Sequence, residues 1–347
     1  MTDAAALHHA RPSEGSAGAK ALSRALPLLS HAELRQLHSL SPARFALRTA
    51  VEWSLILGAM WLWASSGSLL AWLVAFLVIG TRQHALINSI HETTHYGASR
   101  KRNWNDLVSD LFFAGPCLLA TASFREGHLP HHRWLGDPER DTEVREWTQV
   151  SCGGFLRLLL RHFSGLAAVS AVLRYDPRTP TGTGPSKARY LGFVALTNAA
   201  LFAFCWQLGA PLAWLHLWLY PLFSLALLLV TVVALVQHQT EEYARLGALR
   251  RDFAFDPPLT RDTHATSPIE RFFVAPIGAA YHLEHHLFPA VPYSRLGRLN
   301  RLLCARGFYA QPVEGAGSGY LAALARLIRA GRPREVTTRA GIVRGRT

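Results

Sequence analysis

Charged residues and cysteines are both scarce in this sequence. Charged side chains make up 17% of its 347 residues, against about 25% in a usual soluble domain, and half of the chain is hydrophobic. These proportions argue against a simple soluble globule. The four cysteines form no CxxC pair and have no regular spacing, so they indicate neither a disulfide framework nor a thiolate metal site.

Acidic residues are also few, with 23 Asp and Glu against 36 Lys and Arg and a formal net charge of +13. Such a surplus suits nucleic acid, an anionic lipid surface or an acidic partner protein. Long hydrophobic blocks between residues 47 and 236 favour the membrane, and we therefore expect no nucleic-acid partner. The first residues lack the pattern of a secretory signal, and residues 1–20 are expected to be disordered.

Four segments have the roughly 20 mainly apolar residues that a membrane-spanning helix needs. They form two hairpins, with tight turns at Ser65–Gly67 and Gln207–Pro211. Two shorter apolar stretches, 107–122 and 153–173, are interrupted by proline or arginine, and we expect them to lie at the membrane interface or to re-enter the membrane. The predicted spans are 47–64, 68–90, 190–208 and 213–236.

Basic residues are distributed unevenly around these spans. Six lie within the first 50 residues, thirteen within 82–188, one at 189 and sixteen within 237–347, whereas neither tight turn carries any. Lys and Arg beside spans are retained on the cytoplasmic side, so we expect both termini and the middle loop in the cytoplasm. The predicted fold is an all-α integral membrane protein with four transmembrane helices in two hairpins and a cytoplasmic helical cap.

Histidine is abundant, with 17 copies, and eight of them form three tight clusters just beyond apolar segments. Positions i and i+4, or i, i+3 and i+4, share one face of a helix, so each cluster can aim two or three imidazoles at one point. Neutral imidazole binds Zn, Cu, Fe and Ni, and eight nitrogens exceed what one tetrahedral zinc can use. The pattern therefore predicts two metal ions. The clusters are His91 with His95, His128 with His131 and His132, and His282 with His285 and His286.

In this order and spacing, the clusters resemble the histidine boxes of the integral-membrane fatty acid desaturase and hydroxylase superfamily, whose members hold two irons. Residues 267–271 (SPIER) and 281–289 (YHLEHHLFP) are similar to the bacterial acyl desaturase branch, as is 136–138 (GDP) after the second cluster. The resemblance covers roughly residues 45–305. It implies that a histidine-rich diiron site lies in the cytoplasmic cap.

The resemblance implies an enzyme that uses two Fe ions and O2 to attack an unactivated C–H bond of a lipid or acyl chain. Such a bond requires a strong oxidant, which a redox-active metal pair can form from O2 and two electrons, whereas zinc has no accessible redox chemistry. The predicted reaction is the introduction of a double bond into a fatty acyl chain. The predicted location is the bacterial inner membrane, with the metal site on the cytoplasmic side.

Superfamily members usually place a further histidine ligand after the fourth span, and His238 occupies that place here. Some relatives have an asparagine four residues earlier that contributes through a water. This chain has Ala234 at that position, so no such contact is expected.

Three further residues are candidates near the ligands. His84 lies on the same helical stripe as His91, and it can be either a further ligand or a residue that supports the ligands. Asp137 and Asp141 are the preferred acidic partners, because a carboxylate can accept the second ring N–H of a ligand histidine. Glu284 is expected to point away from its two histidine neighbours, since positions two apart lie on opposite helix faces.

Three other functions are kept beside desaturation. The first is a hydroxylase or monooxygenase of a lipid, alkane, carotenoid or lipid-tailed metabolite, because a substrate radical can capture oxygen instead of losing a second hydrogen. The second is an intramembrane zinc protease, because residues 91–95 also fit the HExxH pattern, although six clustered histidines would then have no role. The third is a metal carrier or sensor, which would need ligands or charges within the spans. The predicted spans are almost free of these, and Glu52 near an entrance is the exception.

Electrons must come from a separate protein, because the chain contains neither a fused haem domain nor a Gly-rich dinucleotide fingerprint. The resemblance implies a ferredoxin, rubredoxin or haem-type carrier with its NAD(P)H reductase, and a basic cytoplasmic face would attract such an acidic partner. The chain is divided into an N-terminal cytoplasmic segment (1–44, partly disordered), a membrane domain (45–310) and an arginine-rich tail (311–347) that is expected to contact lipid or a partner.

Overall fold

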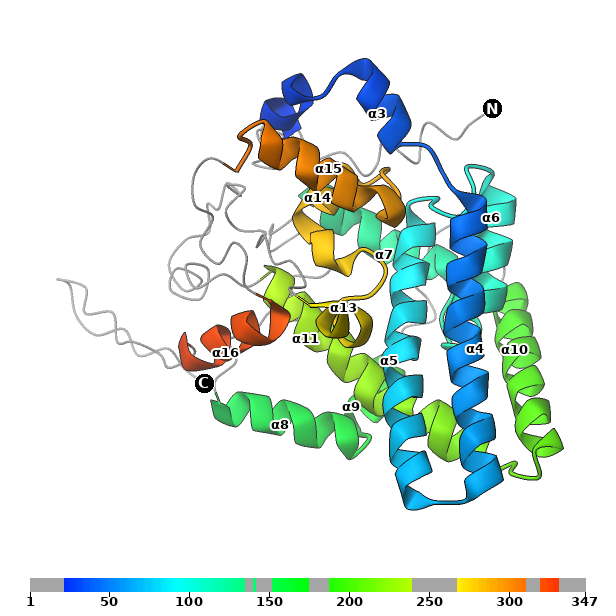
Figure 1. Ribbon diagram of the computed structural model, residues 1–347. Coiled ribbons are helices and arrows are strands. Elements are labelled where there is room, and N and C mark those ends of the chain that lie inside the picture. The colour runs from blue at the N-terminus through cyan, green and yellow to red at the C-terminus, as the bar shows by residue number, and fades with distance from the viewer. Residues whose placement is uncertain are drawn as a thin grey trace.

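The computed structural model describes residues 22–134, 140–141, 152–174, 187–238, 267–309 and 319–330. Every regular element within these ranges is a helix, which confirms the predicted all-α fold (Figure 1). The four predicted spans are also confirmed, because four helical stretches are long and apolar enough to cross a membrane. They are His31–Ser66, Leu69–Thr94, Ala188–Gln207 and Trp214–His238.

The first hairpin joins α4 (Pro42–Ser66) to α5 (Leu69–Thr94) at the predicted turn. Gly67 has a φ of 60°, a left-handed conformation that glycine adopts without strain. The Ser68 hydroxyl caps α5 by accepting the N–H of Ala71 at 3.2 Å. Since α5 continues to Thr94, beyond the predicted limit of residue 90, the helix of the second span itself carries the first histidine cluster.

The second hairpin joins α10 (Lys187–Gln207) to a helical run that ends in α11 (Leu227–His238). Two π-helical segments precede α11, η4 (Trp214–Leu219) and η5 (Leu222–Ala226). Pro221 lies between them and has no N–H to donate, which disturbs regular α-helical bonding at this point. The run packs closely on α5, because a Cβ added at Gly80 would lie only 2.8 Å from Leu225 Cδ2.

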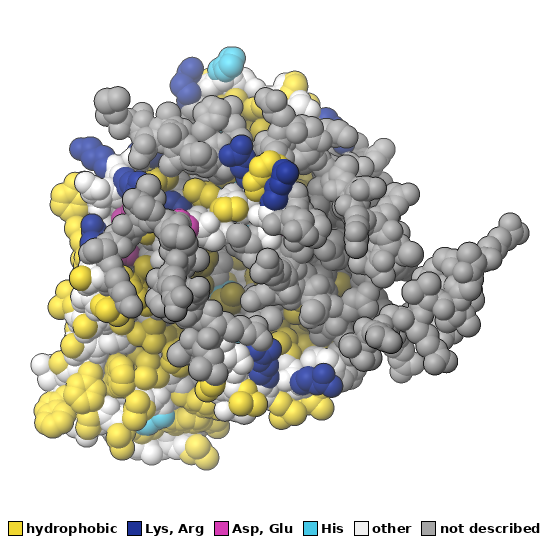
Figure 2. Space-filling view, turned by 180° about the vertical axis from the view of Figure 1, so that it is seen from behind, with side chains coloured by type: hydrophobic (Ala, Val, Ile, Leu, Met, Phe, Trp, Pro, Cys, Tyr) yellow, Lys and Arg dark blue, Asp and Glu magenta, His cyan; other side chains and the backbone are white. Residues whose placement is uncertain are grey.

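The outward faces of the spans are apolar. Figure 2 shows hydrophobic side chains gathered over the lower part of one face, with Lys and Arg mainly above them. Such an extensive apolar surface favours lipid rather than water as its surroundings. Large exposed hydrophobic residues on the spans include Leu47, Val51, Trp61, Leu62, Leu69, Leu70, Leu73, Val74, Leu77, Leu191, Leu196, Phe202, Trp206 and Leu215.

The two shorter apolar stretches fold into helices that do not qualify as spans. The tip of the second stretch contacts the second and fourth spans, since the ring of Phe163 lies 6.3 Å from that of Phe76 and the Phe163 carbonyl accepts the Tyr220 hydroxyl at 3.1 Å. This contact favours a re-entrant position over a purely interfacial one. The helices are α6 (Arg102–Ser109), η2 (Asp110–Ala114) and α7 (Thr121–Trp134), and then α8 (Cys152–Phe163) and α9 (Leu166–Arg174).

A group of short helices covers one end of the bundle (Figure 1). The described part of the N-terminal segment belongs to this cap, because Leu37 packs with Leu299 and Leu303 in one apolar cluster and all three are fully buried. The cap consists of η1 (Leu26–Leu28), α3 (His31–Leu37), α13 (Pro268–Phe273), η7 (Ala279–Tyr281), α14 (His282–Leu287) and α15 (Tyr293–Ala305).

The last described helix, α16 (Tyr320–Ala330), packs on the fourth span. Tyr320, Ala323 and Leu327 are buried in one cluster with Leu228 and Val232 of α11. This part of the predicted tail is therefore a packed helix. Residues 1–21 and 331–347, where disorder and an arginine-rich end are predicted, lie outside the described residues.

Glu52 is not the only buried charge in the first hairpin, contrary to the expectation from sequence. Arg82 lies within α5, is fully buried and places Nη1 3.0 Å from Glu52 Oε2. Arg48 completes a triad with Glu52. The Arg82 guanidinium also lies 3.6 Å from the ring centroid of Phe272 and donates to the Phe272 carbonyl. Because both charges are compensated, this pair fastens α13 to the span without an isolated charge.

Candidate metal centre

The first histidine pair lies where α5 leaves the apolar bundle. His91 is in the last turn of α5 and His95 is the residue that caps it. Their ring centroids are 5.3 Å apart, as expected for positions i and i+4 on one helical face.

The second cluster lies on α7, and the third lies on α14. The rings of His128 and His132 are 4.6 Å apart, which places these two residues on one face of α7. His131 is directed elsewhere, because neighbouring residues on a helix differ by about 100° in direction. On α14, His282 and His286 bring their Nε2 atoms within 2.9 Å of each other.

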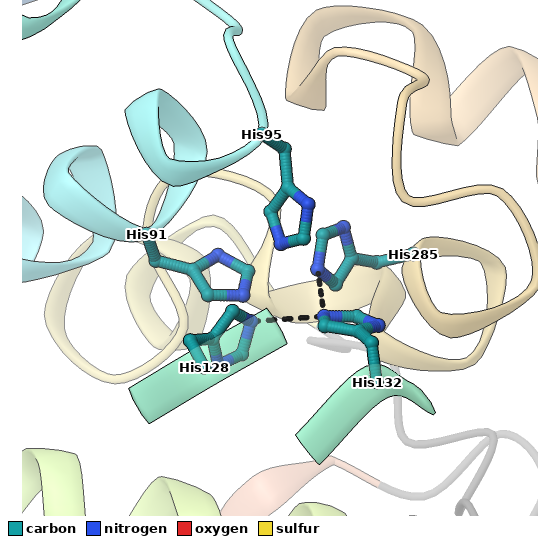
Figure 3. Close-up of side chains that lie close together, drawn as sticks. All are labelled: His91, His95, His128, His132 and His285. Carbon is teal, nitrogen blue, oxygen red and sulfur yellow. Dashed lines mark hydrogen bonds between the residues drawn. The ribbon is translucent and has the colours of Figure 1, made fainter. Parts of the chain in front are cut away.

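The structure brings all nine predicted ligands together in two adjacent sets. In the first set, one nitrogen from each of five histidines lies within 4.8 Å of the others (Figure 3). The same spacing holds for His131, His238 and His286 in the second set, and His282 Nε2 lies 2.9 Å from the Nε2 atoms of His238 and His286. The first set is His91, His95, His128, His132 and His285.

The donor chemistry of these sets fits cations. His132 Nε2 lies 2.8 Å from His128 Nε2 and 3.1 Å from His285 Nε2, although a neutral ring has one N–H to share among such contacts. The buried Nε2 of His95 has no hydrogen-bond partner among the described residues. The lone pairs of these ring nitrogens converge in a buried space, and there are too few N–H protons to bond them all. A metal ion requires such an arrangement of lone pairs.

Five of the imidazoles are held neutral, as metal ligands must be. Burial, followed by the neighbouring histidines, lowers the pKa of His132, His285 and His286 well below 6.5. The pKa values of His95 and His282 are lowered well below 6.5 in the same way, again mainly by burial. At neutral pH these rings therefore present lone pairs and do not carry positive charge.

One of the two preferred carboxylates lies beside a predicted ligand. Asp141 is buried and its Oδ1 lies 3.0 Å from His131 Nδ1. A carboxylate on Nδ1 directs Nε2 of the same ring toward a metal and makes it a stronger ligand. Asp137, the other predicted partner, lies outside the described residues.

His84 belongs to neither set of nitrogens, and its role as a further ligand or as a support for the ligands stays a prediction. It lines a cavity of about 130 Å³ beside the histidines. The apolar part of the wall comes from Ile87, Phe124, Val230, Val233, Ala234, Ile277 and Leu296.

Charged side chains that the sequence reasoning missed fasten the first cluster to its neighbours. Arg125, three residues before His128, donates to the carbonyls of Thr93 and Thr94 at the end of α5 and forms a salt bridge with Asp106 of α6. Arg100 donates to the carbonyl of Ala290, which follows the third cluster, at 3.1 Å. An arginine close to a histidine box is the only signal in the sequence that could have suggested such a role.

Uncharged contacts fasten the third cluster to the fourth span. Gln237 Nε2 donates to Ala279 O and to the Tyr320 hydroxyl, both at 3.0 Å. Tyr320 also donates to Ala279 O. These bonds connect Gln237, the neighbour of His238, with Ala279, which precedes His282. Tyr320 of α16 therefore supports the positions of both histidines.

Comparisons with known proteins agree with this geometry. The fatty acid desaturase family model matches residues 66–312. The chain belongs to the fatty acid desaturase family. It is 27% identical over 251 residues to a sphingolipid delta(4)-desaturase of Drosophila melanogaster, covering 69% of this chain and 68% of the relative. It is 24% identical over 259 residues to a dihydrorhizobitoxine desaturase of Bradyrhizobium elkanii, covering 70% and 71%.

A third relative is a putative sphingolipid delta(4)-desaturase/C4-monooxygenase of Caenorhabditis elegans. It is 23% identical over 277 residues, covering 78% of this chain and 68% of the relative. With these relatives and its four apolar spans, the protein is a membrane oxidoreductase of the desaturase type, and its family implies a lipid substrate. Membership in the fatty acid desaturase family also argues against the hypothesis that the histidines belong to a metal carrier.

Glu92, the glutamate of the HExxH pattern, does not support the hypothesis of a zinc protease. Both Glu92 carboxylate oxygens accept the backbone N–H of Tyr293, at 3.2 and 3.3 Å. The carboxylate also packs on Gly97, where an added Cβ would lie 2.1 Å from Glu92 Oε1. Glu92 therefore joins α5 to α15. Glu284 likewise points away from the histidines, as predicted, and bonds to Asn300 and Tyr309.

Proposed function

We propose that this protein holds two iron ions and uses O2 to introduce a double bond into the fatty acyl chain of a lipid. The observation that carries this proposal is the convergence of nine imidazoles, eight of them buried, in two adjacent sets. A single zinc site would leave most of these nitrogens unused. The nine rings would hold one metal in each set, with His91, His95, His128, His132 and His285 around the first and His131, His238, His282 and His286 around the second.

The chain's own residues prepare the site in three ways. Burial keeps His95, His132, His282, His285 and His286 neutral, Asp141 orients His131, and the apolar part of the cavity wall holds the substrate chain while it excludes water. When bound, iron supplies the redox chemistry with O2 that removal of hydrogen from an unactivated carbon needs. Overall, the substrate loses two hydrogens, and O2 takes up these with two electrons and two protons from outside to give two waters.

The electrons would come from a ferredoxin, rubredoxin or haem carrier that is reduced by an NAD(P)H reductase. Charge supports a docking place on α15, because this helix packs directly on α14 and carries Arg298 and the exposed Arg301. An acidic carrier would be steered to such a surface. We expect Arg301→Glu to slow electron transfer at low salt, with a smaller difference from wild type at high salt.

The names of the first two relatives support desaturation as the outcome. Hydroxylation is the second candidate, because the name of the C. elegans relative includes a C4-monooxygenase. Both reactions begin by removing one hydrogen, so one measurement of the product distinguishes them. Desaturation removes two hydrogens from the lipid, and hydroxylation adds one oxygen.

The test expresses the wild type, His131→Ala and His285→Ala in one host and analyses the lipids by mass spectrometry. Each variant removes one ring from a different set and leaves the spans intact, so the protein should remain in the membrane while product formation is lost. His31→Ala, an exposed histidine of α3, serves as the matched control and should keep full activity. Full activity in either ring variant, or one zinc per chain in the purified wild type, would contradict the proposal.

A further inference from the structure

The cavity wall contains two polar side chains that the metal centre does not use. His84 is 1% exposed, and its Nδ1 has no hydrogen-bond partner among the described residues. Asn88 lines the same cavity and makes one hydrogen bond within the described structure, from its Nδ2 to the His84 carbonyl at 2.9 Å. The carbonyl oxygen of the Asn88 side chain is thus left as an acceptor.

The other polar residues of the wall that are not proposed ligands already have partners. Gln237 donates to Ala279 and Tyr320, and Glu92 accepts from Tyr293. Their bonds fasten helices together and are not offered to a ligand. His84 and Asn88 differ from them, because neither side chain forms a hydrogen bond to another described helix and each keeps hydrogen-bonding capacity for a substrate.

These two residues lie in line with the metal centre. His84, Asn88 and His91 occupy positions i, i+4 and i+7 of α5 and share one helical face. With a rise of about 1.5 Å per residue, Asn88 and His84 precede His91 by roughly 5 and 10 Å along the helix axis. A substrate that reaches the histidines through the cavity would therefore pass both polar side chains.

If a purely hydrocarbon segment of a substrate displaced water from the cavity, Nδ1 of His84 and the side-chain carbonyl of Asn88 would have no hydrogen-bond partner. A buried polar group without a hydrogen bond costs free energy, and the cost is recovered when a ligand supplies the missing partner. A site built for an unsubstituted acyl segment would carry apolar side chains at both positions. The wall is instead suited to a chain that bears a hydrogen-bonding group close to the reacting carbon.

We propose that His84 and Asn88 form a subsite for a hydroxyl or amide group of the substrate. The substrate class is then a lipid whose polar group lies within about 5–10 Å of the oxidised carbon, rather than a plain saturated segment far from any polar group. This inference rests on the proposed function for the identity of the reaction, but binding at the subsite can be measured without turnover.

The test measures equilibrium binding to the full-length, metal-free protein in detergent micelles, by displacement of a fluorescent fatty probe. The two ligands are a saturated N-acyl amino diol lipid and the alkane of the same chain length. Wild-type protein should prefer the amino diol. His84→Phe, which keeps an aromatic ring, and Asn88→Leu, which keeps the size, should each weaken binding of the amino diol by about fivefold to tenfold and leave alkane binding unchanged.

Ile87→Ala is the matched control, because Ile87 lines the same cavity on the same helix but is apolar. It should weaken both ligands by the same factor. Equal preference of the wild type for the two ligands would overturn the proposal, as would an equal effect of His84→Phe and Asn88→Leu on both. Loss of one metal ion per chain in iron-loaded His84→Phe would also overturn it, since His84 would then serve the metal.

The two proposals fail in different ways. If the binding preference holds but iron-loaded wild type, supplied with a reductant and O2, leaves both lipids unchanged, the subsite stands and the oxidation reaction is wrong. If the wild type oxidises a lipid but the variants show no change in preference, the reaction stands and the subsite is wrong.

Discussion

Asp141 and His131 show how one contact can set the direction of a ring. The carboxylate of Asp141 lies beside Nδ1 of His131, so the N–H of the ring is placed on that nitrogen and Nε2 is left for the second set. His132, the next residue, belongs to the first set. Two adjacent residues thus serve different sets, and a carboxylate stabilises the orientation of one of them.

We expect Asp141→Asn to weaken metal binding about 10- to 100-fold, because the amide no longer strengthens the His131 ligand. The measurement is the iron content of the purified protein after competition with a graded series of chelators. Glu126→Gln, which changes another carboxylate near the same cluster on α7, should match the wild type. Equal iron retention by Asp141→Asn and the wild type would show that this carboxylate has no such role.

The neutral histidines also predict how stability depends on pH. In the folded, metal-free protein the pKa values of His95, His132, His282, His285 and His286 lie well below 6.5, mainly because of burial. The unfolded chain takes up protons below about pH 6.5, whereas the folded chain does not. The free energy of unfolding should therefore be constant above this pH and fall below it, by up to about 1.4 kcal/mol per pH unit for each histidine.

Thermal unfolding of the metal-free protein, followed by circular dichroism between about pH 7.5 and 5.5, checks this slope. His285→Gln removes one of the titrating rings and should make the dependence shallower. An unfolding temperature that stays constant over this range would mean that the rings are not held neutral in the folded protein.

At the scale of helices, α5 is the element to which the rest of the site is attached. It is a span for most of its length and then carries the first histidine pair. Arg82 connects it to α13, Arg125 connects its end to α7, and Glu92 connects it to α15. Each contact satisfies a backbone carbonyl or N–H as well as a charge, so the helices that bring the histidines together are held by directional bonds in addition to apolar packing.

α16 is a second supporting element, and Tyr320 carries its contact with the site. Tyr320→Phe keeps the ring in the apolar cluster but removes the hydroxyl that bonds to Gln237 and Ala279. We expect a loss of about 1–2 kcal/mol in the free energy of unfolding. We also expect a lower metal occupancy that is confined to the second set, because the lost bonds adjoin His238 and His282.

Iron per chain and the iron spectrum of Tyr320→Phe test this expectation. Tyr220→Phe is the matched control, because its hydroxyl bonds to Phe163 at the tip of the α8–α9 hairpin, away from the histidines. The control should retain two metal ions. Full occupancy in Tyr320→Phe, or an equal loss in the control, would count against a specific role for α16.

At the scale of the molecule, the proposed orientation places the cap and the metal centre in the cytoplasm. Cys304 offers a test, because it is exposed on α15, whereas Cys117 and Cys205 are buried. In a Cys152→Ser background, a membrane-impermeant maleimide should label Cys304 in inverted membrane vesicles but not in intact cells. Cys304→Ser should abolish the label. Labelling in intact cells would place the cap on the outer side.

Much of this architecture could be predicted from the chain alone. Long apolar runs identify the spans, because a bilayer leaves the backbone few alternatives to a helix. The spacing within each histidine cluster identifies which rings share a face, because helical periodicity is local. His238 and Asp141 could be named as candidates only through the family resemblance and the general chemistry of ligand histidines.

Other features depend on contacts between distant segments, and they could not be predicted. Whether His131 joins His132 or His238 is decided by the rotation of α7 against α11 and α14. The roles of Arg82 and Tyr320 depend on which carbonyl each side chain reaches in the folded chain.

The sequence by itself determined the membrane-spanning helices, the three histidine clusters and the family, since these follow from local hydrophobicity and local spacing. Only the tertiary structure decided how nine rings divide into two sets, which residues hold them and where His84 and Asn88 line the cavity. The physical reason is that a helix sets the directions of its own side chains, whereas the partners of those side chains come from packing between helices far apart in the chain.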